Sequence, residues 1–132
     1  MDGDRLRFFD GHMEAFPLYE AFEGRVTGEI ADVRIKVQKS QISFYNRHLF
    51  ACVSFVRVRK KKDCPKAYIV VTFGLGHKVE SPRIDVATEP YPGRWTHHVL
   101  IGEPEAVDGE PEAVDGELMA WVKEAAEFSA AK

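Results

Sequence analysis

The chain has 132 residues, enough for one domain with its own core, and 45% hydrophobic with 30% charged residues is typical of globular proteins. No run approaches the roughly 20 apolar residues of a membrane helix, and the polar, acidic start MDGDRLRFFDG is unlike a signal peptide. We therefore expect a cytoplasmic protein. The net charge of −3 hides a segregation, because residues 34–66 hold ten Lys or Arg and one acid, whereas residues 103–132 hold two Lys and nine acids. This pattern favours attraction within the molecule, with an acidic partner as the alternative.

The spacing of apolar residues predicts a helix near each end of the chain. The first covers residues 15–28, with Pro17 in its first turn, where the missing N–H does no harm. The second covers residues 116–129, and Asp115 is a suitable N-cap. We expect residues 1–12 to form an N-terminal extension.

Alternating or continuous apolar runs predict about five strands between these helices. The predicted strands are 33–37, 41–46, 49–58, 68–73 and 95–101. The segment ESPRIDVATEPYPG holds three prolines, so we expect it to be irregular. The heptapeptide GEPEAVD occurs twice in tandem over residues 102–115, and we interpret it as a duplicated surface loop.

The order of these elements predicts the fold class. Consecutive strands with short turns favour a mainly antiparallel sheet, and two flanking helices can bury one of its faces. We therefore expect residues 1–132 to form a single two-layer α+β domain.

The stretch YPGRWTHHVLIG, residues 91–102, draws attention because it contains two adjacent histidines. Side chains alternate between faces along a strand, so His97 and His98 cannot both bind one metal ion. Metal sites need three or four convergent ligands, and no matching spacing is present, so we expect no metal and no cofactor. We expect one histidine to be buried and the other to face a groove with Arg94 or Arg83.

Catalytic motifs are missing from the sequence. There is neither a GxSxG elbow nor a phosphate-binding loop, so no catalytic residue is assigned. An enzyme that uses one of the histidines as a general base stays open as an alternative, because imidazole titrates near neutral pH. Its orienting carboxylate would have to come from Glu80, Asp85 or Glu89.

Two polar segments are candidates for binding. In KSQISFYN, the side chains of Lys39, Gln41 and Ser43 share one face if the segment is extended, and such a row can orient a ligand. The segment RVRKKK could grip phosphates, although we favour a solvated strand end, because the chain is acidic overall. The residues of this nucleic-acid alternative are Arg57, Arg59, Lys60, Lys61 and Lys62.

Three segments together resemble one known family. These segments are VQKSQISFYNRHLFACVSF, TFGLGHKVESPRI and EPYPGRWTHHVLI, followed by a helix like ELMAWVKEAAEFS. They resemble the domain-of-unknown-function 5655 family over roughly residues 13–129. The resemblance implies one compact domain, found in bacteria and archaea, with no established activity, cofactor or catalytic residue. It draws attention to Lys39, Gln41, Ser43, Arg83, Arg94, Trp95, His97 and His98.

These observations favour a binding module over an enzyme. Its ligand would be a small anionic or polar molecule, or an acidic protein segment, held over one face of the sheet. The alternatives are a small histidine-dependent enzyme and a nucleic-acid accessory domain.

Overall fold

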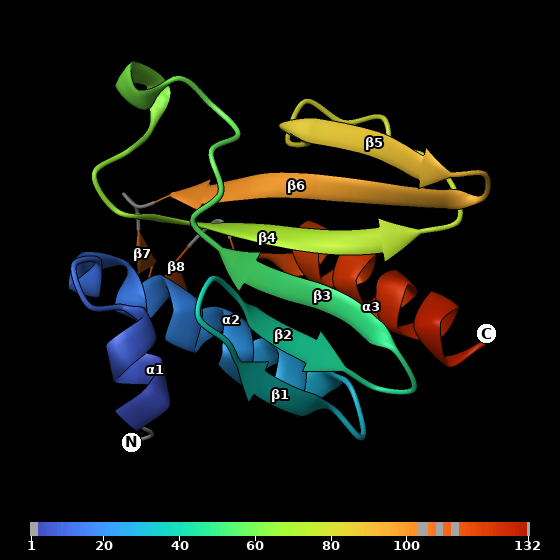
Figure 1. Ribbon diagram of the computed structural model, residues 1–132, viewed down its shortest axis with the longest axis horizontal. Coiled ribbons are helices and arrows are strands. Elements are labelled where there is room, and N and C mark those ends of the chain that lie inside the picture. Colours follow the sequence, from blue (N-terminus) through green and yellow to red (C-terminus); the bar gives the residue numbers. More distant parts are fainter. Residues whose placement is uncertain (1–2, 103–105, 108–109, 112–113, 132) are drawn as a thin grey trace.

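The computed structural model describes the whole chain except residues 1–2, 103–105, 108–109, 112–113 and 132 (Figure 1). The helices are α1 (Gly3–Phe8), α2 (Phe16–Glu29) and α3 (Gly116–Ala130), with short 3-10 helices η1 (Met13–Ala15) and η2 (Lys61–Asp63). The strands of the main sheet are β1 (Arg34–Val37), β2 (Ile42–Tyr45), β3 (Leu49–Ser54), β4 (Tyr68–Leu75), β5 (Val86–Tyr91) and β6 (Arg94–Gly102).

The sheet has six strands in the order β1-β2-β3-β4-β6-β5, and every neighbouring pair is antiparallel. The helices α2 and α3 lie behind the sheet in Figure 1, so one face is covered and the other is open. This arrangement confirms the predicted α+β class, with one strand more than expected.

The core lies between the sheet and the two long helices. In one row across the sheet, Phe44 pairs with Ala51, Ala51 with Phe73, and Phe73 with His97, and all four side chains are buried. The α2 side chains Tyr19 and Phe22 belong to the same apolar cluster. Because side chains alternate along strands, the neighbouring residues of each strand face away from the helices.

The strand β5 corrects the expectation of an irregular segment. It pairs with β6 at the edge of the sheet, and the pairing shifts register between Thr88 and Tyr91. Pro90 is tolerated there because an edge strand has one side without ladder hydrogen bonds. The number of prolines therefore indicated an edge rather than a break.

Two further boundaries differ from the prediction. The strand β3 ends at Ser54, whereas we expected it to run to residue 58. The predicted N-terminal extension contains helix α1, which is tied to α2 because Arg5 Nε donates to Oε1 of Glu23 at 2.7 Å. The hydroxyl of Tyr19 donates to the same oxygen, which extends this network into the core.

The beginning of α3 follows the sequence prediction. The carboxylate of Asp115 accepts a hydrogen bond from the backbone N–H of Leu118 at 3.0 Å, as an N-cap does. Of the duplicated segment before it, the structure describes two short paired strands, β7 (Ala106–Val107) and β8 (Glu110–Pro111). Residues 103–105, 108–109 and 112–113 of the predicted surface loop lie outside the described residues, whereas Val114 at its end is buried.

Among the residues that the structure describes, no helix has the length and apolar character needed to cross a membrane.

Candidate functional site

A row of small polar side chains crosses the open face of the sheet. Ser43 pairs with Cys52, Cys52 with Thr72, and Thr72 with His98, so residues from β2, β3, β4 and β6 stand side by side. Paired residues of antiparallel strands share a face. The register of the sheet therefore aligns four hydrogen-bonding groups that are far apart in the sequence.

Hydrogen bonds join the middle of this row. Oγ1 of Thr72 lies 2.8 Å from Nδ1 of His98, and the thiol of Cys52 is also hydrogen-bonded to Thr72. A neutral imidazole has one donor nitrogen and one acceptor nitrogen. The thiol can donate to the Thr72 oxygen while the Thr72 hydroxyl donates to Nδ1, which gives each donor an acceptor. In this arrangement His98 carries its proton on Nε2, the nitrogen farther from Thr72.

Burial keeps both ends of this chain of hydrogen bonds uncharged near neutral pH. Loss of hydration lowers the pKa of His98 below the ordinary value of imidazole. Burial also raises the pKa of the Cys52 thiol, an effect that a hydrogen bond donated by Thr72 to the thiolate form would partly offset. The thiol is therefore protonated and is not an activated nucleophile. At pH 7 the row is therefore uncharged, and in this arrangement the N–H at Nε2 of His98 is its free donor.

One positive charge on this face belongs to Arg94, whose guanidinium lies on the backbone of Gly74. A Cβ atom built at Gly74 would lie 2.4 Å from Cζ of Arg94, so only glycine leaves room for the guanidinium there. Gly74 pairs with Thr96, which places the guanidinium level with Thr96 and about 7 Å along β6 from His98. Arg94 is half-buried, and its side chain has no hydrogen-bond or ion-pair partner among the described residues.

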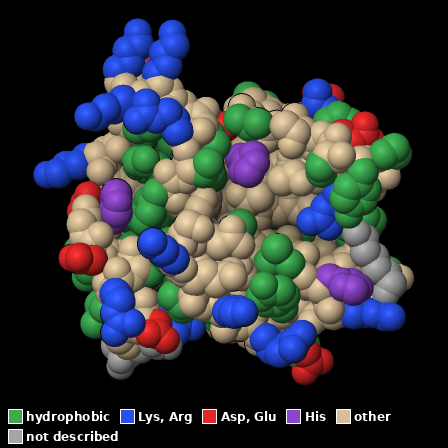
Figure 2. Space-filling model, in the orientation of Figure 1, with side chains coloured by type: hydrophobic (Ala, Val, Ile, Leu, Met, Phe, Trp, Pro, Cys, Tyr) green, Lys and Arg blue, Asp and Glu red, His purple; other side chains and the backbone are tan. Residues whose placement is uncertain are grey.

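Figure 2 shows the open face of the sheet. Backbone and uncharged side chains fill its middle, with a histidine and hydrophobic side chains among them, while Lys and Arg side chains are frequent around the rim. Lys36 pairs with Ser43 and extends the row to β1. Asp and Glu side chains also lie at this rim, so an attraction for anions depends on the cationic groups that lie nearest to the middle of the face.

The second histidine has a different role. His97 is fully buried on the helix side of the sheet, where its ring stacks on Phe73 with a centroid distance of 5.0 Å. Its Nε2 accepts a hydrogen bond from the backbone N–H of Val79 at 3.0 Å, and burial lowers its pKa. As expected, one histidine is buried, and it fastens the loop after β4 to the sheet. Trp95, on the same face, has Lys78 Nζ over its ring at 5.7 Å.

Arg83 does not join the open face. Its Nη1 donates to both carboxylate oxygens of Asp115, at 2.8 and 3.0 Å, and to Oε1 of Glu117 at 3.0 Å. Its guanidinium also lies over the Trp121 ring at 5.7 Å. The structure therefore places this arginine at the beginning of α3, with a structural role.

The polar segment before β2 is only partly extended. Lys39 lies in the turn between β1 and β2 and is exposed. Gln41 Nε2 donates to Ser43 Oγ at 2.7 Å, and Ser43 Oγ donates to Oε1 of Gln38 at 2.6 Å. The hydroxyl of Ser43 is fully buried and saturated by these amides, so it supports the sheet rather than facing a ligand.

The basic segment lies in the loop between β3 and β4. Arg59 is held by Asp85, because its Nε donates to Oδ1 at 2.6 Å and its Nη2 to Oδ2 at 3.4 Å. Asp85 also accepts the backbone N–H of Leu100 at 2.7 Å. This arginine anchors the loop to β6, whereas the other four members of the set are exposed: Arg57, Lys60, Lys61 and Lys62.

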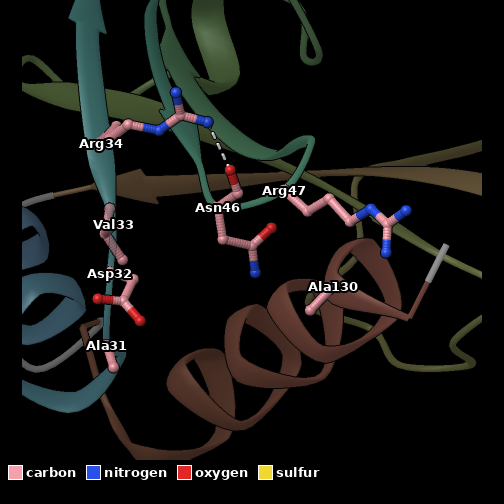
Figure 3. Close-up of a pocket in the computed structure, with 7 residues that line it drawn as sticks. All are labelled: Ala31, Asp32, Val33, Arg34, Asn46, Arg47 and Ala130. Carbon is pink, nitrogen blue, oxygen red and sulfur yellow. Dashed lines mark hydrogen bonds between the residues drawn. The ribbon is translucent and has the colours of Figure 1, made fainter.

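A hollow of about 600 Å³ lies at the other end of the molecule, beside the end of α3 (Figure 3). Its lining residues are Ala31, Asp32, Val33, Arg34, Asn46, Arg47 and Ala130. Arg34 Nη2 donates to the carbonyl oxygen of Asn46 at 2.7 Å, and Asp32 adds a negative charge. The C-terminal end of a helix carries a partial negative charge, so this hollow is a poor anion site despite its arginines.

The arrangement on the open face lacks the geometry of a metal site and of a carboxylate-oriented base among the described residues. Within the described part of the chain, no three His, Cys, Asp or Glu side chains converge as metal ligands. The partner of His98 is the hydroxyl of Thr72, and Asp85, a possible orienting carboxylate, is paired with Arg59. A general base oriented by a carboxylate is therefore not assembled at this point.

Sequence reasoning missed Cys52, Thr72 and Gly74 as members of the site. Their partners are 20 or more positions away along the chain and are fixed by strand register. The local signal was Thr72, the one aliphatic hydroxyl in the largely apolar run YIVVTF.

The fold and the site define an α+β domain with one free sheet face that presents hydrogen-bond donors. The sequence profile of the family described as domain of unknown function (DUF5655) matches residues 7–129. The chain belongs to this family, which confirms the resemblance found in its sequence. Neither curated proteins nor solved structures give a match to the chain.

Proposed function

We propose that the protein is a binding module that takes a small anion on the open face of the sheet, between Arg94 and His98. The observation that carries this proposal is the guanidinium of Arg94, which is half-buried on Gly74 and unpaired among the described residues. Arginine presents several N–H donors in a planar fork that suits carboxylate and phosphate groups. An unpaired, partly buried guanidinium is therefore a natural position for an anion.

The neighbouring groups complement such a ligand. The hydroxyl of Thr96 and the N–H at Nε2 of His98 are further donors on the same face. Thr96 pairs with Gly74, on which the guanidinium lies, and His98 is two residues further along β6, a separation of about 7 Å. A dicarboxylate of four carbons spans this distance, and a phosphate ester places its phosphate on Arg94 and its organic part toward the histidine. Buried aliphatic side chains, Val70 and Leu100, flank the row on its other side.

Isothermal titration calorimetry with succinate and inorganic phosphate tests the proposal, with succinamide as the uncharged control of matched shape. We expect saturable binding of the anions, none of succinamide, and at least a tenfold weaker binding in Arg94→Gln, because a hydrogen bond to a charged group contributes about 1.5–3 kcal/mol. Arg47→Gln, which removes an exposed arginine from the turn between β2 and β3, on the other side of β4 from Arg94, serves as the charge-matched control. Equal binding by Arg94→Gln and the wild type would refute the proposal.

A further inference from the structure

A second hollow, of about 630 Å³, lies between the N-terminal helices and the ends of β2 and β3. It is lined by Phe8, Asp10, His12, Lys39, Ser40, Gln41, Ser54, Phe55 and Val56. We call it the aromatic hollow. It lies across the sheet from β6, and neither Arg94 nor His98 lines it, so its role is independent of the anion site proposed above.

Three rings in the aromatic hollow form a ready stack. Phe55 is stacked on Phe8, with centroids 5.6 Å apart, and on the imidazole of His12, with centroids 4.2 Å apart and planes inclined by 17°. His12 is exposed, so one face of its ring rests on Phe55 and the other is open to a further flat ring. Offset stacking is a favoured arrangement of such rings.

Polar groups surround this stack. The Gln41 amide uses one N–H on Ser43 and keeps its carbonyl and its second N–H, while Ser40, Ser54 and the carboxylate of Asp10 add donors and acceptors. Amide and carboxylate groups pair with the edges of nucleobases. The aromatic hollow therefore offers both a stacking surface and edge partners for a heterocycle.

A strongly basic loop begins at the edge of the aromatic hollow. Residues 55–66, here called the basic loop, include the exposed cations Arg57, Lys60, Lys61, Lys62 and Lys66 and one acid, Asp63. Figure 2 shows Lys and Arg side chains projecting together over this loop, whose short helix η2 is the green turn at the upper left of Figure 1. The Arg59–Asp85 ion pair and the packing of Pro65 against Gly102 hold the loop to β6.

We propose that the aromatic hollow and the basic loop together bind single-stranded nucleic acid. One base stacks on His12, and the phosphates that follow it lie along Lys60, Lys61 and Lys62. Stacking rings beside a cationic strip are the features that single strands require, because unpaired bases expose their faces. An acidic protein segment would use the lysines but has no partner for the ring stack. The negative net charge of the chain does not oppose this assignment, since the positive charge is concentrated at residues 34–66.

Fluorescence anisotropy with a labelled 15-nucleotide oligo(dT) and the matching oligo(U), at pH 8 and several salt concentrations, tests the proposal. The triple variant Lys60→Ala/Lys61→Ala/Lys62→Ala is expected to flatten the slope of log K against log salt by about 2, since each phosphate contact in a single strand contributes about 0.7. His12→Ala is expected to weaken binding roughly tenfold without changing that slope, because stacking is insensitive to salt.

The control variant removes three exposed cations elsewhere, Arg47→Ala/Lys78→Ala/Lys123→Ala, and should keep the wild-type affinity. Circular dichroism of each variant checks that it is folded. Unchanged binding by His12→Ala, equal affinity for duplex DNA, or equal affinity for poly-glutamate would each overturn the proposal. The last result would assign the basic loop to acidic protein segments instead. Absence of saturable binding at 50 mM salt would overturn it as well.

Discussion

Arg94 and Gly74 share one space on the open face of the sheet, because the guanidinium of Arg94 occupies the position that a side chain at residue 74 would need. Gly74 lies inside β4, where glycine is unfavourable by about 0.5–1 kcal/mol relative to alanine. The space left by the missing side chain of the buried residue Gly74 is thus occupied by the guanidinium of Arg94, which has no partner among the described residues.

Because of this close contact, Gly74→Ala tests the position of the Arg94 guanidinium more specifically than a substitution of Arg94 itself does. The new methyl group displaces the flexible end of Arg94 and leaves the charge of the protein unchanged. We expect unfolding free energy equal to that of the wild type or up to about 1 kcal/mol higher, measured by urea denaturation. We also expect at least tenfold weaker binding of succinate or phosphate by calorimetry. Gly24→Ala, on helix α2 where the added methyl group meets no atom within 4 Å, is the control for binding.

The affinity for anions should rise as the pH falls. Because burial lowers the pKa of His98, the ring is neutral at pH 7 and gains its proton only below about 6.5. An anion near Nε2 favours the protonated ring, so binding raises this pKa and tightens as the pH decreases through that range. Calorimetry from pH 8 to pH 5 measures the effect. In His98→Gln the binding should persist at pH 8 and lose this pH dependence, and a wild-type affinity that does not change with pH would contradict the role of His98.

The stability of the fold should fall in mildly acidic solution because of His97. Burial holds the pKa of His97 below the ordinary 6.5, so the unfolded chain takes up a proton before the native state does. The contribution of His97 to the free energy of unfolding is therefore constant above about pH 6.5 and decreases as the pH falls below it. His97→Gln keeps an acceptor for Val79 and should show a smaller decrease between pH 7 and pH 5, in urea denaturation at each pH. His48→Gln, at an exposed position, should behave as the wild type.

Asp115 should contribute to stability through two separable interactions. Asp115→Ala removes both the N-cap of α3 and the ion pair with Arg83, and we expect a loss of about 1–2 kcal/mol. Asp115→Asn keeps an N-cap acceptor and removes only the charge, so it should cost less than half as much, because the ion pair is partly exposed. Urea denaturation of the two variants measures the difference. Equal losses would show that the Arg83 pair, not the cap, is the dominant contribution.

The sequence predicted those features that depend on neighbouring residues. The helices α2 and α3, the N-cap at Asp115 and the opposite faces of His97 and His98 all follow from local spacing. The edge strand β5 was missed, because Pro90 obscures a pattern that only its pairing with β6 reveals.

The site was less predictable than the fold because it depends on register. His98 and Arg94 were among the candidates, but their partners Thr72 and Gly74 could be found only once β4 was aligned with β6. Arg83 was a candidate as well, and its ion pair with Asp115 joins residues 32 positions apart. No local sequence pattern distinguishes an arginine that forms a structural ion pair, such as Arg83, from one whose guanidinium has no partner among the described residues, such as Arg94.

The most direct test of the central claim is an amide ¹⁵N–¹H titration of the wild-type protein with succinate at pH 6. Binding between Arg94 and His98 predicts saturable chemical-shift changes centred on β4 residues 72–74 and β6 residues 94–98, with none of comparable size around Arg34 and Arg47. Gly74→Ala should remove these changes while the rest of its spectrum stays that of the folded protein. A wild-type spectrum in which β4 and β6 do not respond, or an equal response in Gly74→Ala, would contradict the assignment of an anion site to this face.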